Sequence, residues 1–227
     1  SVLLDQVKDG NVVKGFCVPG GADISRRIID EYTNFVGQFG IKGLAWMKRQ
    51  EDGLTSSIVK FFSKELQEQL IDRMNIEVGD LIFIIADNKN STNQALDHLR
   101  RKISRDRNMI DENKYEFLWV IDFPLFSWNA EEQRMESEHH PFTGVAEKDF
   151  DKLDTEPLNV CSSSYDLVLN GYELASGSQR IHDGDLQQKI FNILQLSPED
   201  IEERFGFFVK SLKYGTPPHL GIGIGLE

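Results

Sequence analysis

Cysteine is scarce in this sequence, which contains only Cys17 and Cys161, far apart along the chain. This scarcity excludes a small fold held together by disulfides, and the spacing matches no metal-binding motif. Two unpaired thiols suit a reducing compartment, so we expect a cytoplasmic protein.

Long apolar runs are also missing. No stretch approaches the roughly 18 residues of a membrane span, so no association with a membrane is expected. The N-terminal stretch "SVLLDQVKDG" contains Asp5 and Asp9 and lacks the basic flank and apolar run of a signal peptide. It has no initiating methionine either, and we therefore expect a processed or excised segment.

Positive charge is in deficit. The chain has 25 lysines and arginines against 37 aspartates and glutamates, a net charge of −12. This balance argues against a protein whose whole surface binds nucleic acid, although local basic patches remain compatible with it. The densest basic run, "RRKISRDR" (Arg100–Arg107), falls in a predicted helix, and we interpret it as a solvated face balancing acidic neighbours.

The first half of the chain alternates helix and strand patterns. Serines in N-cap positions precede apolar residues spaced three and four apart, which predicts helices. The predicted helices cover 25–39, 63–75 and 91–104, and the predicted strands cover 43–48 and 80–87. Together they predict a compact α+β unit ending near residue 110. This half shows no paired carboxylates, nucleophile triad or phosphate loop.

The second half is richer in strand patterns. A strand is predicted over Tyr115–Trp128, stopped by Pro124, and a long β-rich stretch over Tyr165–His182. Two helices follow, one near 183–194 and one capped by Ser197 with Pro198 in its first position. We expect antiparallel strands with helices on one side, and a boundary between the halves near 108–113.

Two adjacent histidines, His139 and His140, stand before a proline in the polar stretch "ESEHHPFTG". On a strand their side chains would point to opposite faces, so one metal ion could not readily use both. Two interpretations remain open. The loop presents one imidazole to an anionic ligand and packs the other, or both are incidental polar residues.

The stretch "YDLVLNGYELASGSQRIH" places Asp166, Glu173 and Arg180 at seven-residue intervals. In a continuous strand this odd spacing would put successive members on opposite faces, but a bulge at Asn170–Gly171 or near Gly177 would reset the register. Two carboxylates could then hold Mg²⁺ on a nucleotide's phosphates, and a guanidinium could bind a carboxylate through two parallel hydrogen bonds. The alternative is an exposed sheet face with weak cross-strand ion pairs.

The chain closes on "GIGIGLE", in which every second residue is glycine. Gly221, Gly223 and Gly225 share one face of a strand and leave a flat slot where a planar group could lie. The opposite face is expected to pack into the core through Ile222, Ile224 and Leu226. The alternative is that glycine merely tolerates tight strand packing. The pattern is not the dinucleotide fingerprint, which opens a helix.

Taken together, these stretches resemble the class II aminoacyl-tRNA synthetases. "GIGIGLE" resembles their third signature motif, which leads to an ATP-binding arginine. "FLWVIDFPLF", "HHPFT", "YDLVLNGYELASGSQRIH" and "YGTPPHLGIGIGLE" resemble the bacterial type of aspartyl-tRNA synthetase. "VPGGADISRRIID" and "KGLAWMK" resemble the GAD insertion domain of that type. The resemblance spans nearly the whole chain.

This resemblance implies a GAD-type insertion domain over 1–110. It also implies the C-terminal part of a catalytic domain over 111–227, with an antiparallel sheet flanked by helices and truncated at the third motif. The implied activity is that of an aspartate–tRNA ligase, which joins L-aspartate and ATP into aspartyl-adenylate and transfers the aspartyl group to the 3′ adenosine of tRNA. Intact family members are expected to be homodimers. The first two family motifs are missing, so we expect this chain to be a fragment, inactive alone.

The resemblance also implies roles for single residues. Arg180 matches the arginine that binds the side-chain carboxylate of aspartate. His139 matches the histidine of the loop near bound aspartate, and His140 matches its neighbour; both are expected to bind this substrate. Asp166 and Glu173 match acidic residues that serve ATP and Mg²⁺. The start of the ATP-binding turn corresponds to Gly225, Leu226 and Glu227. No general acid or base is implied, because the substrate carboxylate is already a nucleophile.

Three departures from the family pattern bear on the pocket. "ASGS" at Ala175–Ser178 replaces a "GGGS", Leu220 replaces a glycine, and Glu227 stands where this branch more often has aspartate. Two alternatives remain beside the enzyme. One is a binding module, a regulatory or amidotransferase-associated protein with a GAD domain, for which "SGSQRIH" and "GIGIGLE" would have no purpose. The other is a sibling synthetase for asparagine or lysine, against which the GAD-like half speaks.

Overall fold

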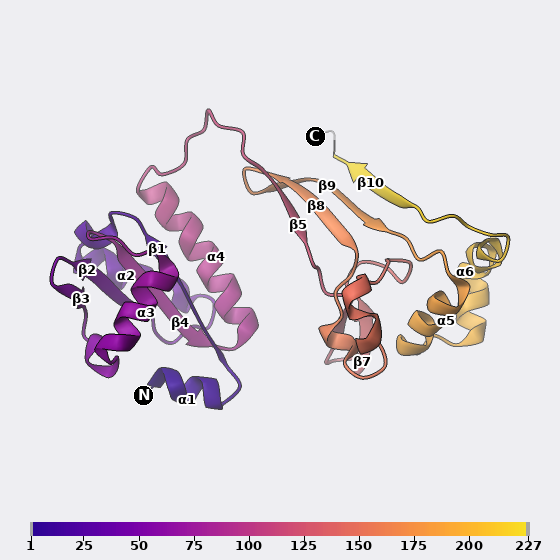
Figure 1. Ribbon diagram of the computed structural model, residues 1–227, viewed down its shortest axis with the longest axis horizontal. Coiled ribbons are helices and arrows are strands. Elements are labelled where there is room, and N and C mark those ends of the chain that lie inside the picture. Colours follow the sequence, from indigo (N-terminus) through magenta and orange to yellow (C-terminus); the bar gives the residue numbers. More distant parts are fainter. Residues whose placement is uncertain (1, 226–227) are drawn as a thin grey trace. The chain divides into compact units, whose positions relative to one another are not determined.

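The computed structural model describes residues 2–225, which are drawn in colour in Figure 1. The chain divides into two compact units, an N-terminal unit, Ser1–Asp111, and a C-terminal unit, Glu112–Glu227. Both combine helices with antiparallel strands, which confirms the predicted α+β class. Among the helices of the described residues, none is long and apolar enough to cross a membrane.

The N-terminal unit is built on a four-stranded antiparallel sheet with the order β1-β4-β2-β3. Its strands are β1 (Val12–Val18), β2 (Ala45–Gln50), β3 (Gly53–Thr55) and β4 (Leu81–Asp87). The first five residues of β4 are all buried, in agreement with its continuous apolar run. Alternate side chains of β4 enter two different cores, one on each face of the sheet.

Helices cover both faces of this sheet (Figure 1). They are α1 (Val2–Lys8), α2 (Arg26–Gly37), α3 (Lys64–Met74) and α4 (Lys89–Asp106), with short 3₁₀ turns η1 (Gly21–Asp23) and η2 (Val59–Phe61). Helices α2 and α4 pack on one face and α3 on the other. Ser25 and Ser63 cap α2 and α3 as predicted. Helix α4 begins earlier than predicted because Asn88 caps it.

A buried carboxylate joins two loops of this unit. Asp80 accepts hydrogen bonds from the backbone N–H of Gly20 at 2.8 Å and of Glu77 at 2.9 Å, and from the Cys17 thiol at 3.4 Å. Burial opposes its ionisation, but the hydrogen bonds from Glu77, Gly20 and Cys17 together lower the pKa of Asp80. Burial, reinforced by Asp80, raises the pKa of the Cys17 thiol to about 12.

Replacing Asp80 with alanine is expected to lower the free energy of unfolding of the N-terminal unit by about 2 kcal/mol, because two backbone N–H groups lose their acceptor. Urea denaturation would measure the loss. The matched control is Asp72→Ala, at an exposed position of α3. Equal effects of the two substitutions would contradict the assigned role of Asp80.

The C-terminal unit contains a second antiparallel sheet with the order β10-β9-β8-β5 and a separate hairpin of β6 and β7. The strands are β5 (Phe117–Ile121), β6 (Phe126–Asn129), β7 (Arg134–Ser137), β8 (Ser164–Leu169), β9 (Tyr172–Gln179) and β10 (Leu220–Ile224). The strand predicted within Tyr115–Trp128 ends before Pro124 as expected, because β5 stops at Ile121, where Asp122 adopts a left-handed conformation (φ 60°). The separate strand β6 after the proline was not predicted.

Helices α5 (Gly184–Ile193) and α6 (Pro198–Leu212) lie between β9 and β10 in the chain, and the 3₁₀ turns η3 (Glu147–Lys152) and η4 (Pro157–Asn159) lie between β7 and β8. Ser197 and Asp200 form a reciprocal capping box at the start of α6, so this predicted helix start is confirmed. Apolar residues from β6, α5 and the intervening loops form the core of this unit.

The hairpin of β8 and β9 corrects the expected positions of the bulge. Asn170 and Gly171 have φ values of 49° and 86° and form the turn between the strands rather than a bulge. The register shifts instead where Leu167 pairs with Ala175 but Val168 pairs with Glu173, so Leu174 is the extra residue. Gly177 keeps its regular partner, Tyr165.

The apolar side chains of β10 are exposed, with 44% of Ile222 and 66% of Ile224 accessible to solvent. The prediction that they pack into the core is therefore wrong for both. Strand β10 lies at the edge of the sheet, and no described element covers this face of it. Leu226, the third residue of that prediction, lies outside the described residues.

Asp149 is a buried carboxylate in η3. It accepts hydrogen bonds from the Lys152 ammonium at 2.5 Å and from the backbone N–H of Cys161 at 3.0 Å. The bond from Lys152 has the largest effect and that from Cys161 the next, and they lower the pKa of Asp149 from 3.8 to about 2. The stability that follows from this shift is present above the pKa of the unfolded chain and disappears as the pH falls through the folded value.

We therefore expect the C-terminal unit to lose stability as the pH falls from about 4 to about 2. The loss should be smaller in Asp149→Asn, which has no carboxyl group to protonate. Thermal unfolding followed by circular dichroism at a series of pH values would measure both proteins. Parallel pH profiles for the two would contradict this assignment.

Candidate functional site

The strand register gathers polar side chains and glycines on one face of the second sheet, here called the polar face. Asp166 pairs with Ser176, which pairs with Gly223. In the next row of that face, Ser178 pairs with Gly221. Directly paired residues project to the same side of a sheet, so the glycines of β10 lie beside these polar residues.

The bulge at Leu174 decides which face Glu173 occupies. Glu173 pairs with Val168, which is two residues from Asp166 on β8 and therefore shares its face. The extra residue in β9 thus brings Glu173 to the polar face with Asp166. The structure places both predicted carboxylates on one surface, one pair of residues apart.

Asp166 has the features of a cation ligand. It is buried, and its Oδ1 is shielded from solvent and has no hydrogen-bond partner among residues 2–225. A buried carboxylate oxygen normally has a partner, so an ion is a chemically suitable one. Glu173 is exposed on the same face. Within residues 2–225, no group of three histidine, cysteine or acidic side chains could hold a metal ion, so the remaining ligands would come from a bound phosphate or water.

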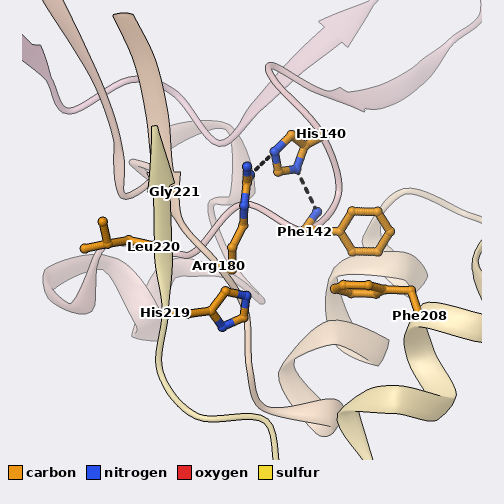
Figure 2. Close-up of a pocket in the computed structure, with 7 residues that line it drawn as sticks. All are labelled: His140, Phe142, Arg180, Phe208, His219, Leu220 and Gly221. Carbon is orange, nitrogen blue, oxygen red and sulfur yellow. Dashed lines mark hydrogen bonds between the residues drawn. The ribbon is translucent and has the colours of Figure 1, made fainter. Parts of the chain in front are cut away.

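Arg180 follows directly on β9, and its guanidinium points into a pocket (Figure 2). Its backbone N–H donates to the carbonyl of His219 at 3.0 Å, which ties it to the start of β10. Its Nη1 donates to the Ser178 hydroxyl at 2.7 Å and contacts Nε2 of His140. The guanidinium is therefore held in place from two sides and keeps donors for a ligand.

His140 lies in the loop after β7, where its Nδ1 lies 3.2 Å from the Thr143 hydroxyl and 3.3 Å from the backbone nitrogen of Phe142, while its Nε2 faces Arg180. Burial, followed by the positive charge of Arg180 and the electrostatic effect of the neighbouring His139, lowers the pKa of His140. The ring is therefore neutral at physiological pH and adds no second positive charge beside Arg180.

The side chain of His139 lies in different surroundings from that of His140. It is exposed, and its ring stands edge-on to Phe123 with the centroids 5.4 Å apart. It does not line the pocket that His140 and Arg180 share. The two adjacent histidines thus have different surroundings, and only His140 is in contact with the guanidinium.

The pocket has a volume of about 310 Å³. Its lining consists of His140, Phe142, Arg180, Phe208, His219, Leu220 and Gly221 (Figure 2). The permanently cationic guanidinium of Arg180 in this pocket suits a small ligand with a carboxylate. Four of these residues, Phe142, Phe208, His219 and Leu220, were not among the residues predicted to bind a ligand.

Aromatic rings support the loop that carries His140. The ring of Phe142 lies 4.4 Å from that of Phe208 and 5.1 Å from that of Phe205, both on α6, and 6.1 Å from that of Phe191 on α5. The spacing of Phe205 and Phe208 places them on one face of a helix. That spacing and the "HHPF" stretch were the available sequence signals, but neither says that the two segments meet.

The glycine strand leaves open space on the polar face. Among the atoms of the described residues, a Cβ added at Gly221 would meet none within 4 Å, and one at Gly223 would meet only a backbone oxygen of Ser176 at 3.9 Å. At Gly225 the nearest atom would be the oxygen of Leu174 at 3.6 Å. The slot predicted from the alternating glycines therefore exists in the described strand. Leu226 and Glu227, predicted to contact ATP, lie outside the described residues.

Comparison with known proteins gives consistent matches. A family model described as "tRNA synthetases class II (D, K and N)" matches residues 26–227. The chain is 63% identical over 227 residues to the aspartate–tRNA(Asp/Asn) ligase of Protochlamydia amoebophila, covering 100% of this chain and 38% of that protein. It is 55% identical over 227 residues to the ligase of the same name from Chlamydia caviae, with the same coverage of 100% and 38%.

A solved structure of an aspartyl-tRNA synthetase from Entamoeba histolytica matches with 22% identity and a TM-score of 0.38, covering 70% of this chain and 25% of that one. The chain spans only 38% of the length of the ligases from Protochlamydia amoebophila and Chlamydia caviae.

Proposed function

Because this chain belongs to the class II tRNA synthetases of the D, K and N group, we propose that it is part of an aspartate–tRNA ligase. The proposed reaction joins L-aspartate and ATP into aspartyl-adenylate and pyrophosphate, and then transfers the aspartyl group to the 3′ adenosine of tRNA with release of AMP. The observation that carries the proposal is Arg180, which enters a small pocket beside a neutral imidazole and the open glycine strand.

Arg180 would select the substrate. Its guanidinium can donate two parallel hydrogen bonds to the side-chain carboxylate of aspartate. Asparagine has the same shape but would leave the guanidinium without a charged partner, which is the kind of loss that gives strong discrimination. Ser178 fixes the guanidinium through its hydroxyl, and His140 borders it without competing for the substrate's negative charge.

ATP would lie against the polar face. The side-chain-free surface of Gly221, Gly223 and Gly225 suits the flat adenosine part, and the carboxylates of Asp166 and Glu173 lie on the same face. These carboxylates would hold Mg²⁺, which neutralises phosphate charge when bound. Leu226 and Glu227 would continue the nucleotide site.

The chain's residues would contribute mainly orientation and charge. The α-carboxylate of aspartate is ionised at neutral pH and attacks the α-phosphorus without a general base. Arg180 fixes the substrate by its side chain, so that its α-carboxylate is oriented for this attack. No residue of this chain is assigned to proton transfer, and none of the site's geometry requires one.

The remaining proposals concern the tRNA substrates, the domains and the assembly of the protein. Their names specify ligases for tRNA(Asp/Asn), and we propose that this protein likewise charges both tRNAs. We also propose that the N-terminal unit is a GAD insertion domain with the predicted range 1–110 and that 111–227 belongs to the catalytic domain. A homodimer in the cytoplasm is the proposed state of the complete enzyme.

The test is aspartate-dependent exchange of pyrophosphate into ATP by the full-length protein, with asparagine and lysine as competing substrates. We expect pyrophosphate exchange with aspartate and none with asparagine or lysine. Exchange with asparagine or lysine instead would favour a sibling synthetase. No exchange with any of the three would favour a binding module.

A further inference from the structure

Tyr165 crosses the sheet on the face opposite the polar face. It lies on β8 in a row of directly paired residues, with Gly177 on β9 and Ile222 on β10. Its hydroxyl donates a hydrogen bond to the carbonyl of Gly221, two strands away, at 3.0 Å. Its ring stands edge-on to Trp119 of β5, with centroids 6.0 Å apart. One side chain therefore connects all four strands.

Gly177 makes this crossing possible. A Cβ at Gly177 would lie 2.6 Å from Cε2 of Tyr165 and 2.3 Å from the carbonyl oxygen of Gly221. Any side chain at this position would occupy the path of the tyrosine ring. The glycine thus serves a different purpose from those in β10, whose bare surface faces the proposed ligand.

Strand β10 has few other attachments. It lies at the sheet edge and pairs only with β9 among the described strands, while its isoleucines are exposed. Two backbone hydrogen bonds flank the strand. The N–H of Arg180 donates to the carbonyl of His219 at 3.0 Å, and the N–H of Gly225 donates to the carbonyl of Leu174 at 2.9 Å. Tyr165 adds a side-chain bond at Gly221, the residue of this strand that lines the pocket with Arg180 and His140.

We infer that Tyr165 is a positioning residue, which sets the place of Gly221 relative to Arg180 and thereby the depth of the nucleotide slot. The effect on nucleotide binding rests on the proposed function. The hydrogen bond from Tyr165 to Gly221 is a property of the sheet and does not depend on that function. Tyr165 touches no substrate in this scheme, because its ring lies on the face away from the slot.

The test compares Tyr165→Phe with Tyr172→Phe in the full-length protein. Both substitutions remove one hydroxyl and keep the ring, and Tyr172 is an exposed residue of β9. In Tyr165→Phe we expect backbone amides of residues 221–225 to exchange with deuterium roughly threefold to tenfold faster, the ratio set by one hydrogen bond. The KM for ATP should rise by a similar factor of about three to ten, with kcat nearly unchanged. Tyr172→Phe should change neither.

Unchanged amide exchange in Tyr165→Phe would overturn the inference. Faster exchange with an unchanged KM for ATP would also overturn it, since the tether would then have no effect on the site. If the unmodified protein does not catalyse aspartate-dependent exchange of pyrophosphate into ATP, the proposed function is refuted. Deuterium exchange of the backbone amides would still decide whether Tyr165 holds β10.

Discussion

Replacing Arg180 with leucine is expected to lower kcat/KM for aspartate by about a hundredfold to a thousandfold in the full-length protein, the size typical for removing one partner of a hydrogen-bonded charge pair. Arg180 brings a permanently charged guanidinium into the pocket, where Ser178 and His140 hold it. Leucine keeps apolar bulk but removes every donor, so the side-chain carboxylate of aspartate would lose its partner.

Steady-state pyrophosphate exchange at varied aspartate concentration would measure this effect. Arg27→Leu is the matched control, because Arg27 is an exposed residue of α2 paired with Glu31. Arg180→Lys should give an intermediate loss, since a lysine keeps the charge but not the two parallel donors. A loss below about threefold in Arg180→Leu would contradict the proposed role.

A second readout does not depend on activity. Burial is the first cause of the low pKa of His140 and the charge of Arg180 is the second. Arg180→Leu should therefore raise the pKa of His140 only part of the way to its ordinary value. Titration of the imidazole by NMR would detect this change even if the protein had no synthetase activity.

Replacing Gly177 with alanine is expected to destabilise the C-terminal unit by about 3 kcal/mol, at the upper end of the cost of overpacking. The new Cβ would lie 2.3 Å from the carbonyl oxygen of Gly221, which is backbone and cannot rotate away. Relief would require β10 to move away from β9. We therefore expect lower stability together with loss of the pocket wall formed by Gly221.

The matched control is Gly223→Ala on β10. Its Cβ would meet only one backbone oxygen at 3.9 Å, so the stability of the unit should change by less than about 0.5 kcal/mol. It would, however, project onto the polar face and should raise the KM for ATP. Urea denaturation of both variants would measure the contrast. Equal destabilisation would show that the glycines of β9 and β10 serve the same purpose, contrary to this account.

Local signals determined much of the fold. Ser25, Ser63 and Ser197 cap helices where predicted, because a serine hydroxyl satisfies the free N–H groups of the following turn whatever surrounds it. The buried strand β4 followed from its uninterrupted apolar run. The alternation of glycine in β10 was also enough to place Gly221 and Gly223 on one face, because the two-residue period is a property of the strand itself.

Other features depended on partners distant in sequence. The extra residue at Leu174, which places Glu173 with Asp166, results from pairing with β8, and no local signal marked it. Phe142 and Phe208 line the pocket because a loop and α6 meet in space, a contact that neither segment specifies alone. Ile222 and Ile224 looked like core residues, but β10 is an edge strand whose apolar face no described element covers. The sequence by itself determined the starts of the three serine-capped helices and the common face of the β10 glycines, whereas bulge position, pocket lining and burial depended on tertiary contacts.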